Sequence, residues 1–556
     1  MAKTTVKATT HLVEKTLFDK IESWGEKNDK KIGFAFLGFS ILFSMLLFNA
    51  RISEANDDAL YLEGGWRYVN EFPNYFYTQN APLYVMLLGL LTKLVGFKLL
   101  VFKLVNVVFN FLAVYFFHKA FRKRIPYAIL IPVLLFISCN HLIQYFASMT
   151  FTEAFYLFLQ SLFFYFFFKL YDALEINPDG FKHKKEFLLV GLFAFFLATT
   201  KSAGIVIVPS LFLFFVLMKQ YKNAFIAVAS YGIFKVSFEI LVRMIWGTQN
   251  QFAAQSKTLT QKDPYDASLG NEDLTGFIVR VIENSNLYFS KRFFQILGFQ
   301  NESSTEVYGL LALFVIALFS IGCYVVFKKN KPLLMFAIFS GAQLLLSFII
   351  LATRWDQPRI VMICMPIMLI IMFYGIYYNF QTSSYKQFMF ISLIVIICSS
   401  IVLSSFKRGA KNIPIVKKNM AGDIYYGYTP DWQNFLKCSA WCADSLPQSA
   451  LVISRKAPMS FVYSKGKKFF PIYSVIKRDS LTNQSNPDSA LAFFNEKKVT
   501  HILLASLRIN PTQNTGQVIN TIHNIIQPIM TKYPNKLKII HTEGVVEQSY
   551  VLEIVK

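Results

Sequence analysis

Long apolar runs separated by short polar connectors make up most of the chain as far as residue 405. Each run holds about twenty residues, the length that a helix needs to cross the hydrocarbon core of a bilayer. The pattern predicts an α-helical polytopic membrane protein with about eleven transmembrane helices. The predicted spans are 32–50, 99–118, 126–147, 152–171, 186–200, 203–218, 223–246, 306–327, 332–352, 358–378 and 387–405.

One further apolar stretch, at 82–97, is ambiguous because it is short, opens with Pro82 and carries Lys93. If it crossed the membrane, three basic connectors would share a side with the acidic loop at 51–80, against the positive-inside rule. If it lies along the interface, those connectors and a fourth one face the cytoplasm with the N-terminal segment. We therefore predict an interfacial helix at 82–97. The four connectors are 118–124, 181–186, 328–331 and 218–223.

This topology predicts three parts of the chain. Residues 1–31 form a cytoplasmic N-terminal segment, residues 32–406 the transmembrane domain, and residues 407–556 an extracytoplasmic domain. A first outer loop at 51–98 and a large outer loop at 247–305 are expected on the same side as the last domain. We thus expect a multi-pass protein of the inner (plasma) membrane.

From about residue 407 short β-rich runs alternate with helical segments. Strands that alternate with helices indicate a small α/β domain. The predicted strands are 450–454, 500–506, 536–543 and 550–555, and the predicted helices are 431–446, 488–498 and 515–533.

Charge and cysteine content narrow the choice of partners. The formal net charge is +23, but Lys and Arg lie mostly in the connectors between apolar runs. That distribution favours topology signals and contacts with membrane lipid over binding of nucleic acid. The six cysteines show no spacing typical of metal ligands, so no metal site is predicted from them.

Ionisable side chains at the outer ends of the spans are the candidates for function, because charges near lipid are costly. Asp57 and Asp58 follow the first span directly. Adjacent helical side chains diverge by about 100°, so the two carboxylates are expected to have different roles. The alternative is that Asn56 or Asp57 caps a short helix that begins near residue 58.

Two more candidates lie at the ends of later spans. Glu153 begins a span on the outer side; alternatively, it suits the positive end of a helix capped by Thr150 or Thr152. Lys201 occupies a tight outer turn against the charge rule, where it suits an anion. A snorkelling lysine is the alternative.

The outer stretch 353–359 places Arg354 and Arg359 around Asp356. Arginine suits bidentate recognition of phosphate. The alternative is an Arg–Asp ion pair, with Trp355 as an interfacial anchor.

His141 lies near the outer end of its span with Asn140 and Gln144. A polar cluster that only makes hydrogen bonds is preferred here over a catalytic histidine. Aromatic side chains of the first outer loop, Tyr61 and Trp66 among them, are able to stack on sugar rings.

Together these residues put acids and bases on one face of the membrane. Such a set suits transfer from a lipid-anchored phosphate donor: a carboxylate deprotonates an acceptor hydroxyl, and cations stabilise the leaving phosphate.

Short motifs occur in a fixed order along the chain: Asn56-Asp57-Asp58-Ala59-Leu60-Tyr61, Asn80-Ala81-Pro82-Leu83-Tyr84, Thr152-Glu153, Thr200-Lys201, and the segment from Arg354 to Pro366. This order resembles the GT-C superfamily of polytopic glycosyltransferases, nearest the protein O-mannosyltransferases and the bacterial aminoarabinose transferases. The similarity covers residues 30 to 405. It implies a GT-C fold with interfacial helices in the first outer loop, and the terminal domain resembles the extra extracytoplasmic domains of bacterial members.

The resemblance also implies roles for individual residues. Asp57 would be the base or the carboxylate that orients the acceptor, Asp58 would support it, and Glu153 would be a second acidic site residue. Lys201 and one of Arg354 or Arg359 would contact the donor phosphate. The expected substrate-binding residues are Tyr61, Trp66, Tyr84 and His141.

The leading hypothesis is a glycosyltransferase that moves a sugar from a polyprenyl-phosphate donor to a protein, lipid or glycan acceptor, with inversion at the anomeric carbon. No cofactor is required, although the Asp57–Asp58 pair is also able to bind a divalent cation. One alternative is a transporter or lipid-sugar flippase, for which repeat symmetry and midplane charges would be expected. The other is a non-catalytic scaffold of the cell envelope.

Overall fold

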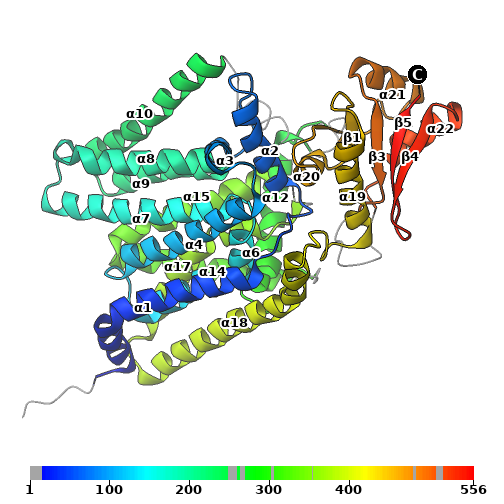
Figure 1. The fold of residues 1–556 in the computed structure, drawn as a ribbon. Coiled ribbons are helices and arrows are strands. Elements are labelled where there is room, and N and C mark those ends of the chain that lie inside the picture. Colours follow the sequence, from blue (N-terminus) through cyan, green and yellow to red (C-terminus); the bar gives the residue numbers. More distant parts are fainter. Residues whose placement is uncertain are drawn as a thin grey trace, which may run out of the picture.

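The computed structural model describes residues 15–247, 259–262, 270–301, 306–352, 355–479, 482, 484–508 and 518–555. Long helices run side by side through most of this structure, and a small sheet domain is attached at one end of the bundle (Figure 1). The bundle helices are α1 (Leu17–Leu47), α4 (Leu99–Phe121), α5 (Tyr127–Cys139), α6 (His141–Ala147), α7 (Glu153–Ile176), α8 (Lys184–Thr200), η2 (Ser202–Val206), α9 (Ile207–Leu217), α10 (Tyr221–Trp246), α14 (Gly309–Lys329), α15 (Lys331–Ile350), α16 (Arg359–Met362), α17 (Met365–Phe380) and α18 (Ser384–Met420).

Every predicted span coincides with a helix or with two consecutive helices of this bundle. Within the described ranges, 7 helices are long and apolar enough to cross a membrane, and the pair α5 and α6, bent by 48°, raises the number to 8. The other predicted spans correspond to the shorter α8, η2–α9 and α16–α17. The prediction of a polytopic helical membrane protein is confirmed.

The helices α2 (Asp57–Asn70) and α3 (Pro82–Val95) do not follow the direction of the long helices, and α2 lies between α3 and the sheet domain (Figure 1). At 14 residues α3 extends about 21 Å, too short to span the hydrocarbon core. The two helices pack closely, because a Cβ on Gly65 would lie 2.8 Å from the Leu88 Cβ. The stretch 82–97 thus pairs with α2.

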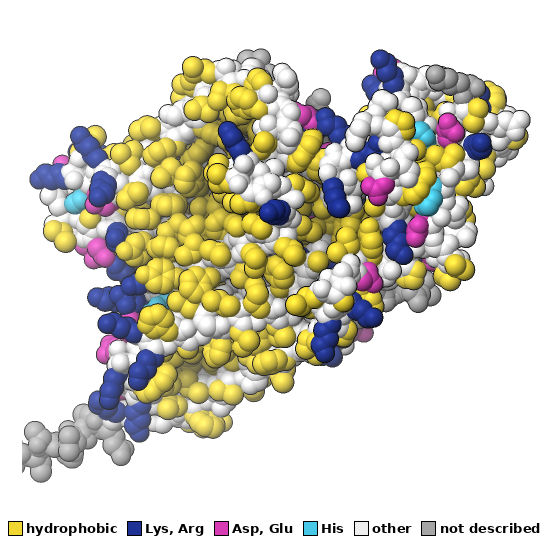
Figure 2. All heavy atoms as spheres, in the orientation of Figure 1, with side chains coloured by type: hydrophobic (Ala, Val, Ile, Leu, Met, Phe, Trp, Pro, Cys, Tyr) yellow, Lys and Arg dark blue, Asp and Glu magenta, His cyan; other side chains and the backbone are white. Residues whose placement is uncertain are grey.

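Basic side chains gather at the end of the bundle that lies away from the sheet domain (Figure 2). The Arg122 side chain there donates to Asp29 at 2.6 Å, and the Asn330 amide donates to the Arg124 carbonyl at 3.0 Å. The connectors 118–124 and 328–331 therefore share one end of the bundle, as the charge rule predicts.

The C-terminal domain holds a five-stranded mixed sheet in the order β2-β1-β3-β5-β4. The strands β1 and β2 are parallel, as are β1 and β3, whereas β5 runs antiparallel to β3 and β4. Helix α18 continues to Met420, past residue 406, where the composition changes. The elements are α19 (Pro430–Ser445), β1 (Val452–Ser454), α20 (Ala457–Tyr463), β2 (Phe469–Pro471), α21 (Pro487–Glu496), β3 (His501–Ala505), α22 (His523–Lys532), β4 (Leu537–Glu543) and β5 (Ser549–Ile554).

The predicted strands and the first two predicted helices of this domain appear within a few residues of their expected places. The prediction of the last helix, 515–533, is wrong for residues 518–522, which are not helical. Residues 515–517 of the last predicted helix lie outside the described residues, and α22 begins at His523. The short elements β2 and α20 have no counterpart in the prediction, because three and seven residues carry little periodicity.

The connection from α10 to α14 contributes three further short elements. They are α12 (Leu274–Asn286), a π-helical turn (Leu287–Arg292) and α13 (Phe293–Ile296).

Candidate active site

Asp57 and Asp58 open helix α2 and play different parts there. The preceding Asn56 has a φ of 79°, and its side chain makes no capping hydrogen bond. The Asp58 carboxylate is buried and accepts hydrogen bonds from the backbone N–H groups of Ser53 at 2.8 Å and Ala59 at 3.0 Å. The Asp57 side chain is 36% exposed. The alternative of a side-chain cap by Asn56 or Asp57 is therefore wrong.

Arg359, at the first turn of α16, forms an ion pair with Asp57. Its Nε also donates to the Gln357 side-chain oxygen at 2.6 Å, and its guanidinium lies 5.3 Å from the centre of the Phe151 ring. These contacts join α2 to α16, which is 302 residues away in the chain.

The alternative of a local Arg–Asp pair is wrong for Arg359. Asp356 instead accepts from Lys291 at 2.7 Å and from Arg292 at 2.5 Å, two cations of the connection between α10 and α14. Arg354, the other candidate, lies outside the described residues.

Glu153 and Lys201 form a second acid–base pair. The Lys201 Nζ lies 2.7 Å from a Glu153 oxygen. Glu153 is the first residue of α7 and is fully buried, whereas Lys201 sits at the turn between α8 and η2. Thr152 at the N-cap of α7 makes no side-chain capping bond. The Lys201 side chain contacts the Glu153 carboxylate and does not snorkel to water. A buried carboxylate requires such a partner.

The two ion pairs belong to one cluster. Arg359 is electrostatically coupled to Asp57 and also to Glu153, whose own partners are Lys201 and Arg359. The Tyr61 hydroxyl faces the same charges: its burial, and next the Asp57 carboxylate, raise the pKa of Tyr61 well above its usual range. Four groups from α2, α7, α16 and the α8–η2 turn therefore meet at one place.

Aromatic side chains form the wall of this cluster. The buried rings of Tyr61 and Tyr84 meet edge to face with centroids 5.7 Å apart. The Tyr84 hydroxyl donates to Asn106 at 3.1 Å, and the Asn106 amide donates to the Phe151 carbonyl at 2.9 Å. Asn106 thereby ties α3 and α4 to the loop that leads into Glu153.

Two predicted substrate-binding residues stand apart from the ion pairs. Trp66 packs against Phe461 of α20, with ring centroids 5.2 Å apart, and so faces the C-terminal domain. His141 is buried at the start of α6, where the neighbouring Asn140 caps the helix and Gln144 accepts from the Ser44 hydroxyl at 2.5 Å. The neighbours of His141 thus form the hydrogen-bonded cluster that was preferred for this position.

The sequence analysis missed Lys103. This lysine of α4 is fully buried and donates to the backbone carbonyls of Asn49 and Arg51, each at 2.5 Å. It is electrostatically coupled to Asp58. A charged residue inside the predicted span 99–118 was the signal that would have found it.

Asp57 and Asp58 differ in burial, and burial changes the pKa of Asp58. Loss of water raises the pKa of Asp58 to about 7, although the two backbone N–H donors and Lys103 oppose this shift. The Asp57 side chain is the more exposed of the two. Within the described ranges, no three His, Cys, Asp or Glu side chains cluster in a way that would hold a metal ion.

The arrangement of these elements defines a fold class. A polytopic helical bundle carries an acidic first loop with paired interfacial-type helices, acid–base pairs at the bundle end, and a C-terminal sheet domain beside them. This is the GT-C fold, as the resemblance of the motifs predicted.

Solved structures similar to this chain are membrane glycosyltransferases. ArnT from Cupriavidus metallidurans bound to undecaprenyl phosphate has a TM-score of 0.52 at 10% identity, covering 94% of this chain and 98% of ArnT. The Archaeoglobus fulgidus oligosaccharyltransferase tethered to an acceptor peptide has a TM-score of 0.52 at 13% identity, covering 87% and 70%. AglB from the same organism, in complex with an inhibitory peptide and a dolichol-phosphate, has a TM-score of 0.51 at 13% identity, with the same coverage. Comparison with the profiles of known families and with curated protein sequences gives no match.

Proposed function

We propose that this protein is a membrane glycosyltransferase that moves a sugar from a polyprenyl-phosphate-linked donor to a protein, lipid or glycan acceptor. The observation that carries the proposal is the meeting of Asp57–Arg359 and Glu153–Lys201 at one end of the bundle. One carboxylate can act as the base, and the other can hold a cation in place. The two cations can balance the negative charge of a phosphate.

In the proposed reaction Asp57 takes the proton of the acceptor nucleophile as that nucleophile attacks the anomeric carbon. The bond from this carbon to the phosphate oxygen breaks, its electron pair stays on the phosphate, and the configuration inverts. Arg359 and Lys201 balance the growing charge on the phosphate. Glu153 keeps Lys201 oriented, and the polyprenyl phosphate leaves as the second product.

The donor class is supported by the similar structures, which were solved with undecaprenyl phosphate in one case and dolichol-phosphate in another. An acceptor peptide is bound to a third. No cofactor is needed in this mechanism, because the two cations neutralise phosphate; activity with and without a chelator tests the requirement for a divalent metal.

The proposed location is the inner membrane, with the N-terminus in the cytoplasm and residues 407–556 outside. An alkaline phosphatase fusion after residue 410 should be active, since that enzyme requires an oxidising compartment. An inactive fusion that accumulates normally would reverse the orientation.

The test of the function uses purified protein and labelled undecaprenyl-phosphate-linked sugars. A glycosyltransferase releases undecaprenyl phosphate and labels an acceptor, a flippase moves the intact donor across a vesicle, and a scaffold does neither. Asp57→Asn should abolish release, whereas Asp488→Asn should leave it unchanged, because Asp488 is an exposed acid on α21 paired with Lys532. The lipid-linked sugar that accumulates on gene deletion identifies the donor.

A further inference from the structure

The segment that leads into Asp57 has no helix or strand of its own. Residues 48–56 connect α1 to α2 without regular hydrogen bonding. A catalytic carboxylate must nevertheless be held within a fraction of an ångström of its working position. Contacts with other parts of the protein must therefore position this segment.

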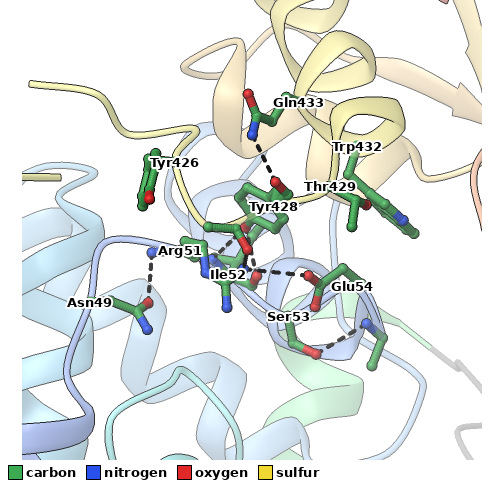
Figure 3. Close-up of polar contacts among 12 residues, drawn as sticks. Asn49, Arg51, Ile52, Ser53, Glu54, Tyr426, Tyr428, Thr429, Trp432 and Gln433 are labelled. Carbon is green, nitrogen blue, oxygen red and sulfur yellow. Dashed lines mark hydrogen bonds and ion pairs between the residues drawn. The ribbon is translucent and has the colours of Figure 1, made fainter. Parts of the chain in front are cut away.

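The hydroxyl of Tyr428 holds the middle of the segment. It accepts the Ile52 N–H at 2.9 Å, donates to the Ile52 carbonyl at 2.6 Å, and lies 2.9 Å from the Tyr463 hydroxyl. Tyr428 is buried and belongs to the connection between α18 and α19, 376 residues further along the chain. Figure 3 shows this ring directed at the segment.

Two further contacts hold the residues on either side of Ile52 in place. The Arg51 guanidinium donates to the Gly427 carbonyl and lies 4.8 Å from the centre of the Tyr428 ring. On the other side, the Lys456 ammonium donates to the Glu54 carbonyl at 2.8 Å. Lys456 lies between β1 and α20, so the sheet domain itself reaches this backbone.

Residues 51–54 are joined to the start of α2 by hydrogen bonds. The Ser53 N–H donates to the Asp58 carboxylate at 2.8 Å, and the Asn56 N–H donates to the Ser53 carbonyl at 3.2 Å. The Leu60 N–H in turn donates to the Asn56 carbonyl at 3.0 Å. A displacement of residues 51–54 would therefore move the first turn of α2 and the Asp57 carboxylate on it.

We infer that the C-terminal part of the chain positions Asp57 through a clamp on residues 51–54, with Tyr428 and Lys456 as its positioning residues. A rigid aromatic ring whose hydroxyl bonds both backbone groups of one residue leaves that peptide little freedom. Lys103 supports the same segment from α4, on the bundle side. The C-terminal domain is, on this inference, part of the catalytic apparatus and not only an appended module.

Hydrogen–deuterium exchange tests the clamp without any substrate. Tyr428→Phe removes one hydroxyl and keeps the ring; Tyr426→Phe is the matched control, because Tyr426 lies two residues away and its side chain is exposed. The Ile52 amide is left out of the comparison, because Tyr428→Phe removes its hydrogen-bond acceptor directly. We expect exchange at the amides of Ala59 and Leu60 to rise about tenfold in Tyr428→Phe and to stay within about twofold of wild type in Tyr426→Phe. Unchanged exchange in Tyr428→Phe would overturn the inference.

The activity measurement rests on the proposed function and separates positioning from general stability. With a labelled undecaprenyl-phosphate-linked sugar, Tyr428→Phe should lower kcat about tenfold and leave the donor KM within about twofold. An unchanged kcat beside faster exchange would overturn the positioning role. If the wild-type protein turns over no donor, the proposed function fails, while exchange still decides whether the clamp exists.

A second variant keeps the test independent of how well Tyr428→Phe folds. Lys456→Met removes the ammonium and keeps the length of the side chain. It should raise exchange at Ala59 and Leu60, and Lys456→Arg should restore protection, because a guanidinium can reach the Glu54 carbonyl. Normal protection in Lys456→Met would remove Lys456 from the clamp and overturn its assigned role.

Discussion

At the end of the bundle away from the C-terminal domain, Asp29 of α1 lies among three donors. His118 is 2.9 Å away, the Arg122 guanidinium 2.6 Å and the Tyr127 hydroxyl 3.0 Å. At the opposite end, the ion pair of Asp57 within the described part of the chain is with Arg359. The same bundle therefore carries a crowded carboxylate at one end and a more open one at the other.

The difference separates a carboxylate that serves the structure from one that is available for chemistry. A carboxylate oxygen that already accepts several bonds has little capacity left for the proton of a substrate. Asp29 is thus suited to hold α1 against α4 and α5. Asp57, half-exposed and bound on one side, can accept a proton or orient an acceptor.

The largest expected effect is on Asp57. Asp57→Asn keeps the shape of the side chain but removes its basicity, so sugar transfer should fall roughly 100-fold to 10,000-fold. The thermal unfolding temperature should change little, because this side chain is 36% exposed. Release of undecaprenyl phosphate from a labelled donor measures the rate. Near-normal turnover would remove Asp57 from the role of base.

The next effect concerns Glu153, which is fully buried. Lys201→Met leaves its charge without the partner that lies 2.7 Å away. Breaking a buried pair in this way costs about 3–5 kcal/mol of stability. Thermal unfolding in detergent measures the loss.

The double variant Glu153→Gln with Lys201→Met removes both charges. It should regain much of the lost stability, while transfer remains impaired because Arg359 is then the one cation left to face the phosphate in the proposed mechanism. A double variant as unstable as Lys201→Met alone would show that the two charges do not stabilise each other.

At the end of the bundle that carries Asp29, a substitution should affect stability more than sugar transfer. Asp29→Asn leaves Arg122 and His118 short of an acceptor, so the free energy of unfolding should fall by about 1–3 kcal/mol. Transfer should remain within about threefold of wild type, because the cluster lies at the other end of the bundle. Activity assays alongside thermal unfolding check this, and a selective loss of activity would break the contrast between the two ends.

The long helices were predictable because their apolar runs match the thickness of a bilayer. Asp57, Glu153 and Lys201 were found for a related reason: charges at the ends of such runs are conspicuous. Both signals are local in the sequence.

The partners of these charges could not be predicted. Arg359 pairs with Asp57 across 302 residues, and Tyr428 reaches Ile52 across 376. Local reasoning offered an Arg–Asp pair within residues 353–359 as an alternative, yet the structure pairs Asp356 with Lys291 and Arg292. The cluster around Asp29 was missed for the same reason, because its donors come from other helices.

The smallest expected effect is on the pH dependence of stability. It distinguishes the buried Asp58 from Asp29, which already has three hydrogen-bond donors. Burial raises the pKa of Asp58 from its ordinary 3.8 to about 7. Between these values the folded protein binds more protons at this residue than the unfolded chain, so its contribution to stability falls as pH rises and levels off above about pH 7.

Asp58→Asn removes this titration and retains one oxygen for the N–H groups of Ser53 and Ala59. The unfolding temperature of wild type minus that of the variant should therefore fall between about pH 4 and pH 7 and then stay level. Subtracting the variant cancels the titrating groups that do not interact with Asp58. A difference that stays level over this interval would mean that the folded protein does not favour the neutral form of Asp58, so that the bonds from Ser53 and Ala59 and the charge of Lys103 outweigh burial.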